Sequence, residues 1–299
     1  MWLLLAFTSA ALLGFYDVFK KISLQNNAVL PVLFLNTVFC SLLFIPFILL
    51  SQFSPQLIQD TMLYVPQADL KTHGMVFLKS IIVLTSWIFG YYGIKHLPIT
   101  LVGPINATRP VMVLVGAMLL YGERLNVYQW VGVILALISL YMLSRSGKKE
   151  GINFVKNRWI LFVAISAIAG ATSGLYDKYL LQRVAPMVVQ SWFNIYQVFI
   201  MGTVLMVLWY PRRDKTTPFQ WRWSIFCISL FLSVADFAYF YALSFEGVMI
   251  SIVSMVRRGS VLISFLFGAF IFREQNLKSK ALDLLLVLIG MIFLYLGTK

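Results

Sequence analysis

Apolar runs long enough to cross a membrane recur along the whole chain, and they limit its possible folds more than any other feature. A spanning helix needs about 20 consecutive apolar residues. The 299-residue sequence is 60% hydrophobic and 12% charged, with a mean hydropathy of +0.85. A soluble domain usually carries about 25% charged residues. The pattern therefore predicts an all-α, polytopic membrane protein.

We predict ten transmembrane helices joined mostly by short connections. Their approximate ranges are 2–19, 29–51, 75–95, 99–120, 128–145, 158–181, 188–210, 222–243, 247–272 and 281–297. A basic connection over 147–157 divides the chain into units of five spans, residues 1–146 and 158–299. Too little sequence lies outside the spans for a separate soluble domain.

The two units share residues in the same order, which indicates an internal repeat. The matched positions are Gly14-Phe-Tyr-Asp17 with Gly174-Leu-Tyr-Asp177, Asn36 with Asn194, Tyr92 with Tyr241, and Arg109 with Arg258. Because five is odd, two such units insert with opposite orientation. Inverted repeats place a binding site near the bilayer midplane and let it open to either side.

Three segments of the first unit, Tyr91–Leu101, Arg109-Pro110 and Leu120–Leu125, resemble the EamA-type repeat of the drug/metabolite transporter superfamily. The second copy reads Tyr239–Gly247 and Phe272–Gln275. The resemblance covers nearly the whole chain. It implies ten helices in two inverted five-helix repeats, with a central cavity lined mainly by the first four spans of each half. Members export amino acids, drugs and metabolites, or exchange nucleotide sugars and sugar phosphates.

Arginines occupy intramembrane positions that are usually apolar in EamA exporters. The pair Arg257-Arg258 resembles the basic pair of triose-phosphate/phosphate translocators, whereas Arg109 does not match their other basic ligand residue for residue. The pair lies about 13 Å inside its span at 1.5 Å per residue. A central arginine costs about 2.5–3.5 kcal/mol on insertion scales. Compensation by carboxylates, water or an anionic ligand is therefore required.

Two interpretations of these arginines remain open. Arginine offers a planar fork of donors that suits phosphate or carboxylate, which favours an anion site. The alternative is an internal salt-bridge network with Asp17, Asp177 and Asp236, which are also candidates for proton coupling. Pro110 follows Arg109 and removes a helical hydrogen bond, and Gly259 follows Arg258, so both helices are expected to be irregular beside an arginine.

The remaining candidates are polar or aromatic residues at corresponding places in the two halves. They can hydrogen-bond a solute or join helices to each other: Tyr16, Tyr176, Asn36, Asn194, Trp87, Tyr92 and Tyr241. We expect Asp17 to pair locally with Lys20, and Lys79 to extend to the membrane interface. Glu123 and Glu274 follow spans and are expected to cap or pair locally.

Most Lys and Arg outside the spans lie in odd-numbered connections, so the positive-inside rule places both termini outside. The basic residues form short runs between spans, which argues against nucleic acid. Metal-ligand spacing, a nucleophile–histidine pair and Gly-x-x-x-x-Gly-Lys are absent from the sequence. We therefore expect neither an enzyme nor a cofactor.

The expected function is secondary-active transport of a small anionic metabolite, phosphorylated or carboxylated, by alternating access. The alternative is an exporter of amino acids or amphipathic drugs in which the arginines are structural. The expected partners are the solute, the lipid bilayer and a coupling ion or counter-solute. We expect a monomer or homodimer in a bacterial inner membrane.

Overall fold

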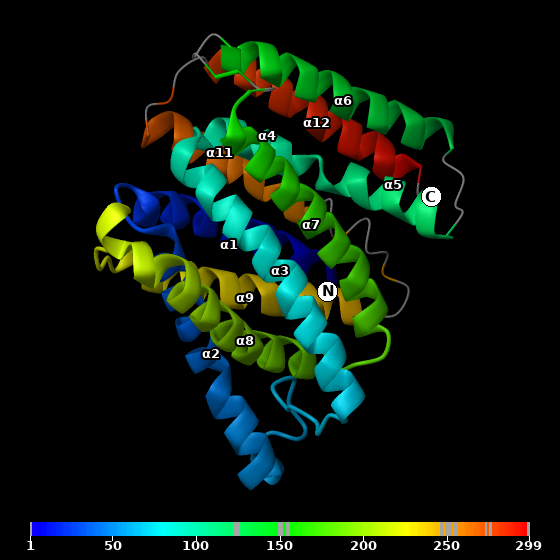
Figure 1. Ribbon diagram of the computed structural model, residues 1–299. Helices are drawn as coiled ribbons and strands as arrows, with labels where there is room; N and C mark the ends of the chain where they lie inside the picture. Colours follow the sequence, from blue (N-terminus) through cyan, green and yellow to red (C-terminus); the bar gives the residue numbers. More distant parts are fainter. Residues whose placement is uncertain are drawn as a thin grey trace.

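The computed structural model describes residues 2–121, 126–148, 152–153, 156–245, 248, 253, 256–272, 274 and 277–297. Every regular element in these residues is helical (Figure 1). In chain order they are α1 (Trp2–Leu24), α2 (Val29–Phe53), η1 (Pro55–Leu57), α3 (Leu70–His96), α4 (Ile99–Ala107), α5 (Arg109–Tyr121), α6 (Val127–Lys148), α7 (Arg158–Leu181), α8 (Pro186–Val204), η2 (Leu205–Trp209), η3 (Tyr210–Lys215), α9 (Ser224–Ser244), α11 (Ser260–Phe270) and α12 (Leu277–Leu296). The all-α prediction is confirmed.

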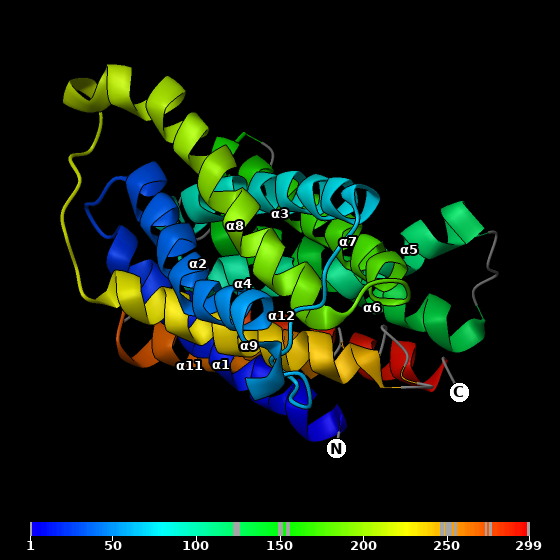
Figure 2. The same ribbon diagram turned by 90° about the horizontal axis from the view of Figure 1, so that it is seen from below.

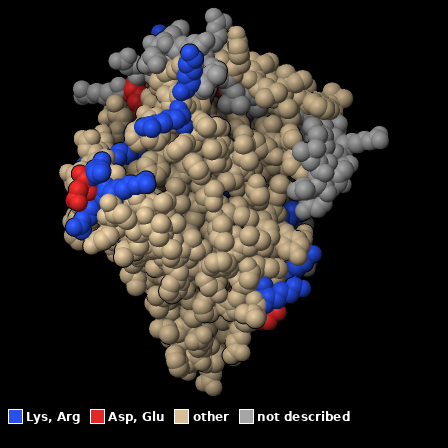
Figure 3. All heavy atoms as spheres, in the orientation of Figure 1, with Lys and Arg blue, Asp and Glu red and all other residues tan. Residues whose placement is uncertain are grey.

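Six described helical segments are long and apolar enough to cross a membrane. They are α1, α2, α3, α7, α9 and the continuous segment Pro186–Lys215, which joins α8 to η2 and η3. Across the middle of the face seen in Figure 3 the surface is almost uncharged, and Lys and Arg lie toward its edges. Such a surface suits contact with lipid. The chain is therefore an integral, multi-pass membrane protein.

The other predicted spans coincide with α4 and α5, α6, α11 and α12. The fourth is broken where expected, since α4 ends at Ala107 and α5 begins at Arg109. Pro110 has no N–H to donate to the Asn106 carbonyl one turn earlier, and just before it the Thr108 amide donates to the Ile105 carbonyl at 3.2 Å, three residues back instead of four. The irregular backbone predicted beside Arg109 is therefore present, as a break at Thr108. In the ninth predicted span, α11 begins directly after Gly259, and much of 247–255 lies outside the described residues.

Helices distant in sequence pack side by side in matched pairs (Figures 1 and 2). The pairs α1–α9, α3–α7 and α6–α12 have the most extensive contacts, and α2 packs on α8. Glycines allow the closest approaches. A side-chain carbon at Gly14 in α1 would lie 2.5 Å from Ile263 Cβ of α11, and one at Gly93 in α3 would overlap Val163 of α7. The pairs α1–α9 and α3–α7 lie around the centre of the bundle, and α6–α12 lies at its edge (Figure 1).

Hydrogen bonds tie several helix ends together at one end of the bundle, which we call the basic end. Ser23 and Ser224 join α1 to α9 at 2.6 Å, and Lys21 Nζ donates to the Leu97 carbonyl after α3 at 2.5 Å. Lys95 Nζ donates to Thr217 Oγ1 at 3.0 Å. The basic residues of several odd-numbered connections therefore gather on the same side of the molecule.

Candidate functional site

A cavity of about 160 Å³ lies at the centre of the bundle, lined by residues of α1, α3, α4, α5, α7, α9 and α11, by Arg257 and Arg258, and by Phe193 of α8. The long lining helices α1, α3 and α7 each contribute one face. On α3 the lining residues recur every three or four positions, from Lys79 through Val83 and Trp87 to Gly90, as residues on one side of a helix do. For comparison, an apolar cavity of about 150 Å³ binds benzene. The described space therefore suits a small solute.

The cavity is rich in charge. Its described lining contains five cationic side chains and three carboxylates. The cationic residues are Lys20, Lys79, Arg109, Arg257 and Arg258, and the acidic residues are Asp17, Asp177 and Asp236. Positive charge therefore exceeds negative charge by two.

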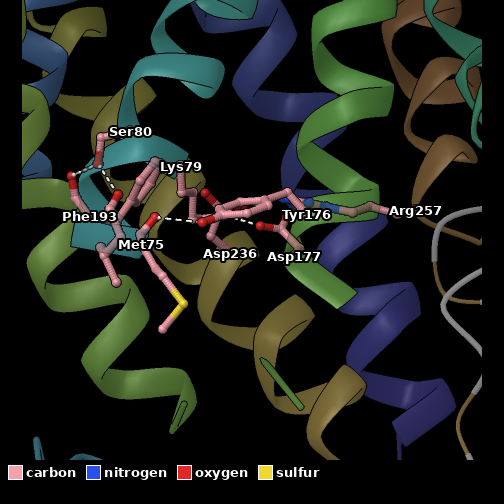
Figure 4. Close-up of polar contacts among 9 residues, drawn as sticks. Met75, Lys79, Ser80, Tyr176, Asp177, Phe193, Asp236 and Arg257 are labelled. Atoms are coloured by element: carbon pink, nitrogen blue, oxygen red, sulfur yellow. Dashed lines mark hydrogen bonds and ion pairs between the residues drawn. The ribbon is translucent and has the colours of Figure 1, made fainter. Parts of the chain in front are cut away.

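Each carboxylate forms an ion pair with one cation. Lys20 Nζ lies 2.5 Å from Asp17 Oδ1 within α1, which confirms the predicted local pair. Lys79 of α3 pairs with Asp177 of α7. Figure 4 shows Lys79, Asp177 and Asp236 together, with Arg257 approaching from the opposite side to pair with Asp236. These three pairs account for every carboxylate in the described lining.

Arg109 and Arg258 are left with no carboxylate at ion-pair distance among the described residues. Arg109 Nη2 donates to Ser166 Oγ of α7 at 3.2 Å. Its guanidinium lies over Gly170, where a side-chain carbon would be 2.6 Å from Nη1. The Nε atoms of Arg109 and Arg258 are buried without a hydrogen-bond partner. Donors are thus available to a bound group.

The structure brings eight of the predicted site residues to the cavity: Tyr16, Asp17, Trp87, Arg109, Asp177, Asp236, Arg257 and Arg258. Tyr16 also lies beneath the Lys20 ammonium, 4.2 Å from its ring centroid. Trp87 packs edge-on against Phe193, with the ring centroids 6.0 Å apart. Aromatic rings and charged groups therefore both line the wall.

The other five predicted residues lie outside the lining and contact other parts of the protein. Asn36 is fully buried, and its Oδ1 lies 3.1 Å from Ser229 Oγ of α9, which donates to it. Tyr92 stacks on Trp159 at 6.2 Å between centroids. The Tyr176 hydroxyl donates to the Met75 carbonyl at 3.2 Å, and that of Tyr241 donates to the Met62 carbonyl. Asn194 of α8 is buried.

Sequence reasoning missed Lys79. The expectation that it extends to the interface is wrong, because its side chain is 2% exposed and paired with Asp177. The signal was present in the sequence: Lys79 lies two turns before Trp87, so both residues occupy the same face of α3. Nearby tyrosines on one helix can also face different sides: Tyr91 and Tyr239 line the cavity, whereas Tyr92 and Tyr241 do not.

Glu274 caps a helix of the other half of the chain. Its carboxylate accepts from the amides of Ile99 and Thr100, at 2.7 and 2.9 Å, and from the Thr100 hydroxyl. The prediction of a purely local role is wrong, because its partner helix, α4, is about 175 residues away in sequence. Carboxylates are favoured at helix N-termini, where free amides carry partial positive charge. Glu123 lies outside the described residues.

An all-helical membrane bundle with a charged, solute-sized internal cavity has the features of a membrane transporter. The sequence profile of the EamA-like transporter family matches residues 1–145 and 157–296, and the chain belongs to that family.

A solved structure described only as "Crystal structure of protein" is similar over 99% of this chain and 97% of its own, with a TM-score of 0.66. At 16% identity this likeness shows the fold alone. No curated protein matches the sequence significantly.

Proposed function

We propose that the protein is a secondary transporter that moves a small anionic solute, phosphorylated or carboxylated, by alternating access. The observation that carries this proposal is the pair Arg109 and Arg258, which line the cavity without carboxylate partners among the described residues. Within each of the three ion pairs, the two opposite charges neutralise each other. An anionic solute would complete the charge balance of the cavity.

The energetic argument depends on the depth of the two arginines. Each guanidinium costs about 2.5–3.5 kcal/mol in the middle of a membrane span on insertion scales, so two cost roughly 5–7 kcal/mol. A phosphate or carboxylate can accept two parallel hydrogen bonds from one guanidinium. The unpartnered Nε atoms of Arg109 and Arg258 are donors for such bonds. Binding of an anion therefore offsets a cost that a neutral solute leaves in place.

Alternating access is supported by the packing of the helices. If α1, α2 and α3 are exchanged with α7, α8 and α9, the contact α1–α9 becomes α7–α3, and α2–α9 becomes α8–α3; both members of each pair are present. The same exchange swaps α2 with α8, and its extension swaps α6 with α12, so the contacts α2–α8 and α6–α12 map onto themselves. This pattern supports two inverted units of five spans, residues 1–146 and 158–299, joined by 147–157. Arg109 and Arg258 occupy matching places in the two units.

The basic end defines the proposed orientation. Under the positive-inside rule it faces the cytoplasm of a bacterial cell, with both termini outside. Single cysteines at Ser54 in the connection after α2, and at Thr216 after η3, distinguish the two orientations. A membrane-impermeant thiol reagent added to intact cells should label the first and leave the second unlabelled. The reverse labelling contradicts the orientation.

The proposal is tested by binding and transport with charge-neutralised variants. Inorganic phosphate, a sugar phosphate and a dicarboxylate should each be screened for an upward shift in the melting temperature of the purified protein, with neutral sugars as controls. Uptake of the stabilising anion into proteoliposomes should be lost in Arg109→Gln and Arg258→Gln. Arg212→Gln, on the exposed η3 segment, is the matched control and should transport normally.

The same variants distinguish the alternative, export of amino acids or amphipathic drugs with structural arginines. In that case Arg258→Gln lowers the melting temperature without changing solute selectivity. Retained anion uptake by both Arg109→Gln and Arg258→Gln, in protein that inserts normally, refutes the anion proposal.

A further inference from the structure

A buried carboxylate in α12 lies apart from the cavity lining and has no use in the site described above. Asp283 is fully buried, and both of its carboxylate oxygens lack a hydrogen-bond partner among the described residues. An ionised carboxylate buried without a partner is very unfavourable, and such a group normally takes up a proton instead. Buried acids in membrane helices often carry protons during transport.

The natural partner of Asp283 is engaged elsewhere. Lys280 precedes it by one turn of α12 and is also fully buried. Side chains three residues apart on a helix are close enough to form an ion pair. In this conformation, however, Lys280 Nζ donates to Thr100 Oγ1 of α4 at 3.0 Å. Lys280 is therefore held at the N-terminus of α4.

Thr100 belongs to the contact that docks α4 at the basic end. Glu274 accepts hydrogen bonds from the Thr100 hydroxyl and from the first two amides of α4. Gly268 of α11 also fits closely here, because a side-chain carbon at that position would lie 2.7 Å from Ile99 Cγ2. Lys280 can thus reach Thr100 only while the start of α4 is docked against the second half.

Few other charges lie on the elements that pack against α12, and the described parts of α4 and α11 carry none. From α6, the uncharged Ser139 approaches Asp283, and its hydroxyl donates to the main-chain carbonyl of Asp283 at 2.6 Å. Because Ser139 of α6 meets Asp283 while Asn126 meets Gly297, the two helices are antiparallel. Arg145 and Lys148 of α6 therefore lie toward the start of α12.

We propose that Asp283 is a proton-binding site coupled to the docking of α4 at the basic end. While α4 is docked, Lys280 binds Thr100 and Asp283 holds a proton. When α4 moves away, the Lys280 ammonium turns to Asp283, the carboxyl O–H bond breaks, and the proton passes to water at the basic end. Low pH therefore favours the docked state, and high pH favours the undocked state.

The coupling is tested without any solute, so its failure is separate from failure of the anion-transport proposal. A single cysteine replaces Leu101, a fully buried residue of α4, after Cys40 and Cys227 are changed to alanine. The rate of labelling by a small thiolate-reactive reagent is measured from pH 5 to pH 8. An exposed reference cysteine supplies the correction for ionisation of the thiol itself. The corrected rate should rise by up to about tenfold per pH unit, the limit for a single linked proton.

Asp283→Asn mimics the protonated acid and should give slow labelling at every pH. Lys280→Met removes the cation that stabilises the deprotonated state, and should likewise abolish the rise even if the first variant folds poorly. Asp69→Asn, at an exposed acid before α3, is the control and should leave the pH dependence intact. Unchanged pH dependence in either α12 variant overturns the proposal.

Discussion

The ion pair between Lys79 and Asp177 gives a quantitative prediction about stability. The two side chains are 2% and 8% exposed, and Phe193 and Phe240 flank the ammonium with ring centroids 5.0 and 4.9 Å away. Water has little access to either charge. Removing one member of such a pair leaves the other charged and buried, which costs about 3–5 kcal/mol. Lys79→Met should therefore lower the free energy of unfolding by about that amount.

The pair Lys20–Asp17 is the internal comparison. Its side chains are 10% and 25% exposed, so solvent screens the charge that remains after Lys20→Met. A solvent-exposed pair contributes about 0–1 kcal/mol, and because Lys20 itself is buried this pair should lie between that value and the cost at Lys79. Lys20→Met should thus be the less destabilising of the two lysine variants.

The assay is unfolding in mixed micelles of increasing SDS content, followed by circular dichroism. The double variant Lys79→Met/Asp177→Leu removes both charges and should recover most of the loss, because replacing a buried pair with apolar side chains is often neutral or stabilising. Equal losses in Lys79→Met and Lys20→Met would refute the reasoning. So would a double variant as unstable as the worse single variant.

Two further predictions concern the cavity wall. Gly170→Ala puts a carbon 2.6 Å from Arg109 Nη1 and must displace the guanidinium. We expect solute affinity, measured by titration calorimetry, to fall about tenfold or more, which is the effect of losing one charged hydrogen bond. The control Gly74→Ala, with open space around it, should leave the affinity unchanged. Tyr91→Phe removes a buried hydroxyl without a partner at the cavity wall and should alter solute affinity without lowering the melting temperature. Tyr92→Phe, which keeps its stacking on Trp159, should change neither quantity.

Much of the architecture could be predicted from the sequence because its causes are local. Apolar runs of spanning length identify the long helices, and Pro110 marks the break between α4 and α5 without knowledge of any neighbour. The capping of α4 by Glu274 could not be predicted in this way, since it depends on the packing of α11 and α12 against α4. Contacts between distant helices carry no local signal.

The site was predicted in part for a similar reason. Arg109, Asp236 and Arg258 stand out because charge within a span is costly wherever it lies. Tyr92 was selected by its match to Tyr241 across the repeat, but a constant sequence offset does not say which side of a helix faces inward. Lys79 was missed because its distance from the end of its span suggested access to water, whereas the packing of α7 and α8 over α3 determines its burial.

Of the two lysine–aspartate pairs, only Lys79–Asp177 restricts which helices can move together. Lys20 and Asp17 belong to the same helix and travel with it, so their pairing is indifferent to any rearrangement. Lys79 and Asp177 connect α3 to α7, and separating those helices would expose two charges to an apolar surround. The least costly motion keeps α3 with α7, and by the matching contact α1 with α9. If access alternates as proposed, each moving body therefore combines helices from both halves of the chain, and the boundary between the bodies differs from the boundary between the two units.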